Sequence, residues 1–156
     1  MFDIILLEPE IPPNTGNVIR LCANTGSRLH LVHPLGFSID DAQLRRAGLD
    51  YQQMVRVREY PDLAACLASV AAPRLYAVET GGMRRYSDIR FHPGDAFLFG
   101  RETEGLSRAV LESLGGEAQV SIPMRPGNRS INLSNAVALV IYEAWRQNDF
   151  VMNVNP

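Results

Sequence analysis

The sequence contains no lysine, only two cysteines and only three histidines among its 156 residues. All 15 basic residues are therefore arginine, the side chain best suited to bidentate contact with phosphate. A zinc site needs about four ligands at recognisable spacing. The cysteines and histidines show no such spacing, so we expect no bound metal, and we interpret Cys22 and Cys66 as buried, reduced thiols.

Long apolar runs are also missing, and the one strongly apolar run, Val137–Tyr142, is far too short to cross a bilayer. The first residues, MFDIILLEPEIPP, lack the basic start and the small-residue cleavage site of a signal peptide, so we expect a cytoplasmic protein. Apolar residues make up 46% and charged residues 21%, which is typical of a folded chain. The length predicts one domain over residues 1–156, and the net charge of −2 argues against a general nucleic-acid coat protein.

The common nucleotide-binding and hydrolase motifs are absent as well. The sequence has no GxxxxGK[ST] loop, no GxGxxG after its first apolar segment and no GxSxG elbow. We therefore expect any ligand site to depend mainly on backbone amides and carbonyls of loops, with few ionised side chains.

Short apolar segments and amphipathic segments alternate along the chain. Strands are predicted at Phe2–Leu7, Arg28–Val32, Val55–Val57, Arg74–Glu79, Asp95–Gly100 and Ala118–Ile122, with a polar, glycine-rich loop before Asp95. Helices are predicted from a cap at Asn14 or Thr15 to Gly26, and at Ser38–Gly48, Asp62–Ala72, Ser107–Leu114 and Asn132–Gln147. This alternation predicts an α/β fold with a mostly parallel sheet and helices on both faces.

The last predicted helix is apolar around most of its circumference, from Ala136 to Trp145. A helix of this kind has to be covered on more than one side, and in so small a protein the sheet covers only one. We therefore expect a homodimer in which a second copy covers the other side.

Three loops contain more Gly, Asn, Ser and Pro than simple connections require. They are Pro12–Arg20, Gly100–Ser107 and Pro123–Asn135. Taken singly, most of these residues are explained by helix caps and turns. Together they indicate a binding site, because ligands of parallel sheets bind outside the carboxyl ends of the strands.

Segments within these loops carry a resemblance to a known family. NTGNVIR at Asn14–Arg20, FGRETEGL at Phe99–Leu106 and IPMRPGNRSINLSNAVALVIYEAWRQ at Ile122–Gln147 resemble the three motifs of the SPOUT (SpoU-type) RNA ribose 2′-O-methyltransferases. LRRAGLDY at Leu44–Tyr51 is similar to the minimal, single-domain members, which methylate the wobble nucleotide (position 34, cytidine or uridine) of leucine tRNAs. The resemblance covers about residues 2–148. It implies S-adenosyl-L-methionine as cofactor, the tRNA anticodon stem-loop as substrate, a C-terminal trefoil knot and a dimer packed through the first and last helices.

The resemblance also implies roles for individual residues. The cofactor pocket would be formed by Val78, Gly100, Glu102, Ile122, Met124, Ser130 and Leu133. Arg20 matches the catalytic arginine, and because a guanidinium pKa lies above about 12, we expect Arg20 to stabilise developing charge without acting as a base. The candidates for RNA contact are Asn17, Arg45, Arg46, Arg129, Asn135 and Tyr142.

Other functions remain open at this point. The same reaction on another tRNA or on ribosomal RNA fits the motifs equally well. A non-catalytic RNA-binding module of the same fold, or a flavodoxin-like nucleotide binder, would account for the loops but not for Arg20. Glu104 stands where relatives often have a basic residue; if that position touches RNA in relatives, we expect either the RNA contact or the substrate to differ here.

Overall fold

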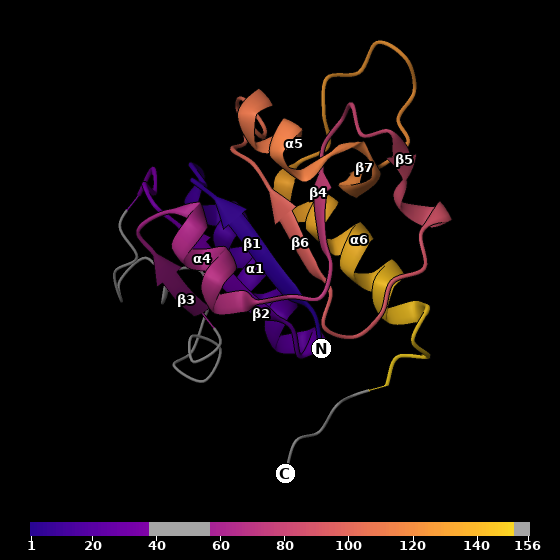
Figure 1. Cartoon of the computed structure of the whole chain (residues 1–156), viewed down its shortest axis with the longest axis horizontal. Helices are drawn as coiled ribbons and strands as arrows, with labels where there is room; N and C mark the ends of the chain where they lie inside the picture. The colour runs from indigo at the N-terminus through magenta and orange to yellow at the C-terminus, as the bar shows by residue number, and fades with distance from the viewer. Residues whose placement is uncertain (38–56, 152–156) are drawn as a thin grey trace.

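The computed structural model describes residues 1–37 and 57–151 (Figure 1). The predicted helix Ser38–Gly48 and the candidate residues Arg45 and Arg46 lie outside these ranges. A seven-stranded sheet with the order β3-β2-β1-β6-β4-β7-β5 forms the centre of this part of the chain, and all of its neighbouring strands run parallel. The strands are β1 Asp3–Leu7, β2 Arg28–Val32, β3 Val57–Tyr60, β4 Leu75–Val78, β5 Arg84–Arg85, β6 Ala96–Phe99 and β7 Gln119–Ser121.

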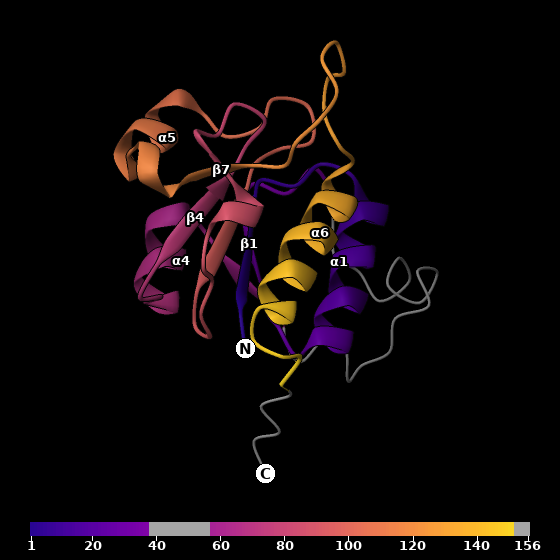
Figure 2. The same cartoon turned by 90° about the vertical axis from the view of Figure 1, so that its right-hand side faces the viewer.

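Helices cover both faces of the sheet, as the alternating pattern predicts. Two lie on one face and two on the other (Figure 2): α1 Pro12–Thr25 and α6 Leu133–Arg146 against α4 Leu63–Val70 and α5 Arg108–Leu114. Short 3-10 helices, η1 Tyr86–Asp88 and η2 Gly116–Ala118, complete the described elements. Within the described ranges, every helix is too short or too polar to span a bilayer.

The two apolar cores follow from the alternation of side chains along the central strands. In β1, Ile4 and Leu6 point into the core shared with α1 and α6, whereas Ile5 points into the core shared with α4 and α5. In β6, Phe97 and Phe99 join the first core and Leu98 joins the second. Because both faces are covered, these strands are nearly continuous apolar runs, as is usual for buried parallel sheets.

Asp3, at the start of β1, is a buried carboxylate with strong partners. Arg28 of β2 donates to it from Nε and Nη2, each at 2.7 Å, and His30 Nε2 lies 2.8 Å from Asp3 Oδ1. Burial alone would raise the pKa of Asp3, but the hydrogen bonds from His30 and Arg28 outweigh it and lower the pKa below its ordinary value. The ionised carboxylate therefore fastens β1 to β2.

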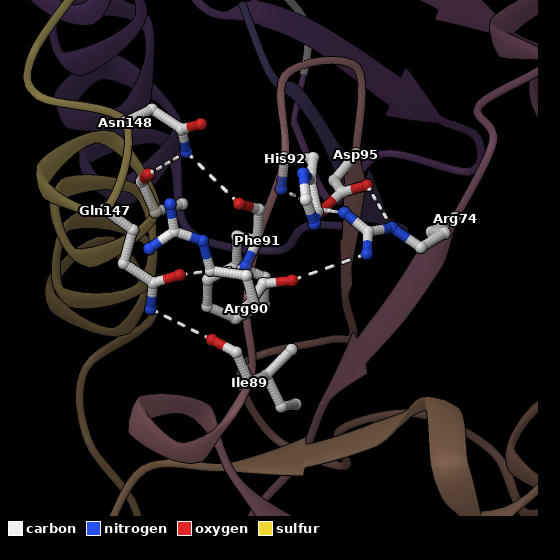
Figure 3. A network of polar contacts seen from close by, with 9 residues as sticks. Arg74, Ile89, Arg90, Phe91, His92, Asp95, Gln147 and Asn148 are labelled. Atoms are coloured by element: carbon white, nitrogen blue, oxygen red, sulfur yellow. Dashed lines mark hydrogen bonds and ion pairs between the residues drawn. The ribbon is translucent and has the colours of Figure 1, made fainter.

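A second polar network ties the end of α6 to the segment before β6 (Figure 3). The Gln147 amide accepts from Phe91 N at 2.9 Å and donates to the Ile89 carbonyl at 2.9 Å. Asp95, fully buried, receives two hydrogen bonds from Arg74, at 2.8 and 2.7 Å. These contacts lie at the end of the sheet where β4 and β6 begin. The loops that follow β1, β4, β6 and β7 lie at the other end, where the strands finish.

Three local predictions differ from the structure. The third strand was expected at Val55–Val57; residues 55 and 56 lie outside the described ranges, and β3 extends beyond the expected end, from Val57 to Tyr60. The stretch predicted as a polar loop before Asp95 contains the edge strand β5 and the helix η1. Neither Asn14 nor Thr15 caps α1, which begins at Pro12 with Ile11 in the N-cap position, because proline at the first helical positions has no N–H to satisfy.

Candidate active site

The loops that follow β1, β4, β6 and β7 meet at the carboxyl edge of the sheet. They enclose a cavity of about 660 Å³, within the range of small-molecule sites. The N-terminal turn of α1 and the first turn of α6 complete its wall. Its lining is Ile11, Asn14, Val78, Glu79, Thr80, Phe99, Gly100, Arg101, Glu102, Thr103, Glu104, Gly105, Ile122, Met124, Arg129, Ser130, Ile131, Asn132, Leu133 and Ala136.

The structure brings all seven predicted cofactor residues to this one cavity: Val78, Gly100, Glu102, Ile122, Met124, Ser130 and Leu133. They come from four segments that are up to 55 positions apart, from 78 to 133. Four of them give the cavity an apolar wall, and the other three, Gly100, Glu102 and Ser130, lie on the loops after β6 and β7. Arg129, predicted to contact RNA, lies at the same cavity.

Gly100 and Gly105 fold the loop after β6 tightly back on itself. A Cβ on Gly100 would lie 2.1 Å from the carbonyl carbon of Gly105, which is backbone and cannot move aside. Gly105 has a φ of +69°, in the region that favours glycine, and a Cβ there would meet the Glu79 carboxylate. That carboxylate accepts a hydrogen bond from Leu106 N at 2.9 Å. Glycine is therefore required at Gly100 because of a close approach of two backbone segments.

Glu102 fastens this loop to the start of α1. Its carboxylate accepts hydrogen bonds from Glu10 N at 2.7 Å, from Ile11 N at 3.1 Å and from the Asn14 side-chain amide at 3.1 Å. Asn14 is buried, and its Oδ1 accepts from Asn132 Nδ2 at 2.9 Å. The three motif loops are thus joined by one hydrogen-bonded chain, Glu102–Asn14–Asn132, which no local sequence pattern indicated.

Carboxylates surround the Gly100–Ser107 loop. Glu10 accepts from Thr103 N at 3.1 Å and from its hydroxyl at 2.8 Å. Arg101 forms an ion pair with Glu8, and its Nη1 lies 3.7 Å from Glu104 Oε2. Glu104 therefore contacts an arginine of its own loop, and most of its side chain, 75%, is exposed. The side of the cavity formed by this loop is acidic.

The remaining predicted residues of the described ranges lie outside the cavity. Asn17 and Arg20 are exposed on α1, and Asn135 and Tyr142 are exposed on α6. The two helices pack side by side, so these four residues belong to one helical layer (Figure 2). Within residues 1–37 and 57–151, no three Cys, His, Asp or Glu side chains are grouped so that they could hold a metal ion.

Comparison with known proteins now decides the family. The family model described as SpoU rRNA Methylase family matches residues 1–142. The chain belongs to this family. The SpoU assignment confirms the resemblance carried by the three motifs.

Curated relatives of this SpoU chain are similar over almost their whole length. A protein of Methylovorus glucosotrophus (strain SIP3-4), named tRNA (cytidine(34)-2′-O)-methyltransferase, is 55% identical over 150 residues, 96% of this chain and 97% of the relative. A protein of Escherichia coli (strain K12) with the same name is 52% identical over 147 residues, 94% of each chain.

Solved structures agree with the family. One that concerns the 2-OH methylation of C/U34 on tRNA superposes with a TM-score of 0.86 at 41% identity, and covers 96% of this chain and 97% of its own. The SpoU methyltransferase AviRb of Streptomyces viridochromogenes, in complex with the cofactor AdoMet, superposes with a TM-score of 0.81 at 25% identity, and covers 94% of this chain and 60% of its own. The second structure shows that a SpoU fold of this kind holds AdoMet.

Proposed function

We propose that this protein transfers a methyl group from S-adenosyl-L-methionine to the ribose 2′-hydroxyl of the wobble nucleotide, cytidine or uridine 34, of leucine tRNAs. The observation that carries the reaction and its position is the near full-length similarity to relatives named tRNA (cytidine(34)-2′-O)-methyltransferase, whereas the restriction to leucine tRNAs rests on the family resemblance. The cavity supports it, because the seven residues expected to bind the cofactor lie together there.

The cavity fits the proposed cofactor in size and in chemistry. Val78, Ile122, Met124 and Leu133 offer an apolar wall for the adenine, and the tight turn at Gly100 leaves backbone amides and carbonyls to read the polar groups. Glu102 lines the cavity too, but its two oxygens already bind the start of α1. We therefore assign Glu102 to holding the pocket together and not to direct contact with the ribose.

Arg20 is the proposed catalytic residue. When bound, S-adenosyl-L-methionine supplies an already activated methyl group, which leaves orientation and charge stabilisation to the protein. Guanidinium groups do not act as bases in proteins, so the role of Arg20 is to hold a neighbouring phosphate and to stabilise the alkoxide that develops as the 2′-hydroxyl loses its proton. The proton passes to phosphate or water.

The proposed dimer is supported by the outward side of α6. Leu139 and Tyr142 are each 43% exposed there, although the neighbouring Val140 and Ile141 are fully buried. Phe150 and Val151, just beyond the helix, are exposed as well. A second copy packed against α1 and α6 would cover these apolar side chains. The exposed residues Asn17, Arg20, Asn135 and Tyr142 would then lie at or beside the interface.

Further parts of the proposal rest on the family resemblance. They are one methyltransferase domain over residues 1–156, a trefoil knot in its C-terminal third, recognition of the anticodon stem-loop, and a cytoplasmic location. None of these involves a metal ion.

The test is methyl transfer with purified protein. The protein is incubated with methyl-labelled S-adenosyl-L-methionine and bulk tRNA, and the product is digested to nucleosides and mapped. We expect label in 2′-O-methylated cytidine or uridine at position 34 of leucine tRNAs. Label only in another tRNA or in ribosomal RNA would keep the reaction and replace the substrate, whereas no transfer to any RNA would overturn the proposal.

A second experiment tests Arg20. The Arg20→Ala variant should lose turnover but bind the cofactor nearly as well as the wild type, measured by calorimetry. Arg20→Lys keeps the charge but not the bidentate geometry, so we expect a partial loss. Near-normal turnover of Arg20→Ala would show that the catalytic role is wrongly assigned.

A further inference from the structure

Arginines gather at the β5–β7 edge of the sheet, beside the cavity. β5 is the edge strand, and Arg85 in it pairs with Ser121 of β7. The chain then leaves β7 into the Pro123–Asn135 loop, and Arg125 follows Ser121 by four residues, at most about 14 Å of extended chain. The same loop returns to the cavity wall with Arg129. This edge lies on the right of Figure 1, with the loop above it.

The charges at this edge are not neutralised. Arg85, Arg125 and Arg129 are all exposed, and in the described part of the chain no carboxylate lies within ion-pair distance of any of them. Arg84 differs, because its Nη1 lies 3.3 Å from Glu117 Oε2. Most other described arginines, such as Arg28 and Arg74, are paired with carboxylates. Three guanidinium groups without a carboxylate partner among the described residues are therefore found along one edge of an acidic protein.

The other side of the cavity has the opposite charge. Glu79, Glu102 and Glu104 line the cavity on the side of the loop after β6, and Glu10 binds that loop. A polyanion that reaches the cavity is repelled from that side and attracted to the side of Arg129. The difference in charge thus sets the side from which an RNA strand can enter.

We infer that the β5–β7 edge is an RNA-binding surface on which Arg85 and Arg125 hold backbone phosphates of the strand next to the target nucleotide. The inference rests on the proposed function, in which the cavity lined by Arg129 holds the methyl donor, so that the target ribose has to reach this cavity. Guanidinium groups bind phosphate oxygens bidentately, and these contacts position a strand without reading its sequence. Of the three arginines of this surface, Arg125 and Arg129 belong to the third motif segment, and Arg85 lies outside all three motif segments.

The experiment measures RNA binding as a function of salt. A fluorescein-labelled anticodon stem-loop and an unstructured oligoribonucleotide are titrated with the wild-type protein and with Arg85→Gln and Arg125→Gln. The logarithm of the association constant falls linearly with the logarithm of the salt concentration, and each lost phosphate contact should make this slope shallower by about 0.7 to 0.9. If the variants bind as the wild type does at 1 M salt, this change is about a five- to eightfold weaker affinity at 0.1 M salt. The matched control is Arg90→Gln, which removes an exposed arginine from the segment before β6, next to the end of α6 (Figure 3).

The outcomes separate this inference from the proposed function. We expect the two edge variants to lower the slope on both RNAs, the control to keep it, and methyl transfer by the edge variants to show a raised KM for RNA at unchanged kcat. Wild-type slopes in both edge variants, or an equal loss in Arg90→Gln, would overturn the surface while leaving methyl transfer intact. Binding that depends on Arg85 and Arg125 without methyl transfer would support the surface and contradict the proposed function.

Discussion

Glu102 offers the sharpest test of how the cavity is held together, because its carboxylate alone accepts three hydrogen bonds from the start of α1. Replacing it with glutamine keeps the shape of the side chain, removes the charge and turns one acceptor oxygen into a donor. That donor would face the N–H groups of Glu10 or Ile11, which bind the carboxylate at 2.7 and 3.1 Å in the native protein. Glu102→Gln therefore loses at least one charge-assisted hydrogen bond and the favourable charge at the N-terminus of α1.

The size of the effect follows from these contacts. A hydrogen bond to a charged group contributes about 1.5–3 kcal/mol, and a negative charge at a helix N-terminus about 0.3–1 kcal/mol. We expect Glu102→Gln to lower the free energy of unfolding by about 2–4 kcal/mol, which for a chain of this size is a fall in Tm of roughly 4–16 °C. Glu104→Gln is the matched control, since Glu104 is in the same loop and its exposed contact with Arg101 contributes less than about 1 kcal/mol.

The assay is urea unfolding followed by circular dichroism, with the midpoint and the slope compared among the three proteins. The slope of the free energy of unfolding against urea concentration should not change, because neither substitution alters the surface area exposed on unfolding. If the free energies of unfolding of Glu102→Gln and Glu104→Gln differ by less than about 0.5 kcal/mol, a typical effect of a neutral surface substitution, the proposed role of Glu102 as an anchor of α1 is refuted.

Three further variants test other parts of the structure. Gly100→Ala should lower the free energy of unfolding by about 3 kcal/mol or prevent folding, since its Cβ would meet backbone at 2.1 Å; Gly81→Ala, with nothing within 4 Å, should behave as wild type in thermal unfolding and in calorimetric cofactor binding. The lowered pKa of Asp3 contributes stability above the ordinary carboxyl pKa, and this contribution is lost as the pH falls through the folded value. Asp3→Asn should therefore be less stable than wild type at pH 7 and show a flatter fall in Tm between about pH 5 and pH 2; an identical pH profile would contradict this. Leu139→Glu should shift the molar mass measured by light scattering toward the monomer with little change in helix content, and an unchanged dimer mass would place the interface elsewhere.

The layers of the fold could be predicted because they follow from local patterns. The apolar runs of β1 and β6 are typical of strands buried on both faces, and Asp62 and Ser107 cap α4 and α5 as their position before each helix indicates. The two-residue strand β5 could not be predicted, since Arg84 and Arg85 have no apolar alternation and pair only because β7 lies beside them. Edge strands of this kind depend on a neighbour that is distant in the sequence.

The predicted N-cap of α1 was wrong for a related reason. Asn14 is a favoured capping residue, and a local reading of the sequence places it at the start of the helix. Two prolines before it extend the helix backward, and the amide of Asn14 is used instead to join Glu102 to Asn132. The composition of the loops thus predicted where the site lies, but not which side chains hold it together.

That difference has a consequence for function. Glu102 and Asn14 are separated by 88 positions, yet their hydrogen bond joins the loop after β6 to the helix that carries Arg20. Three hydrogen bonds of Glu102, to Glu10 N, Ile11 N and Asn14, tie the loop after β6 to the start of α1. Arg20 lies on the same helix, which ends at Thr25. We therefore expect a ligand that fills the cavity to influence the orientation of the proposed catalytic arginine through these contacts.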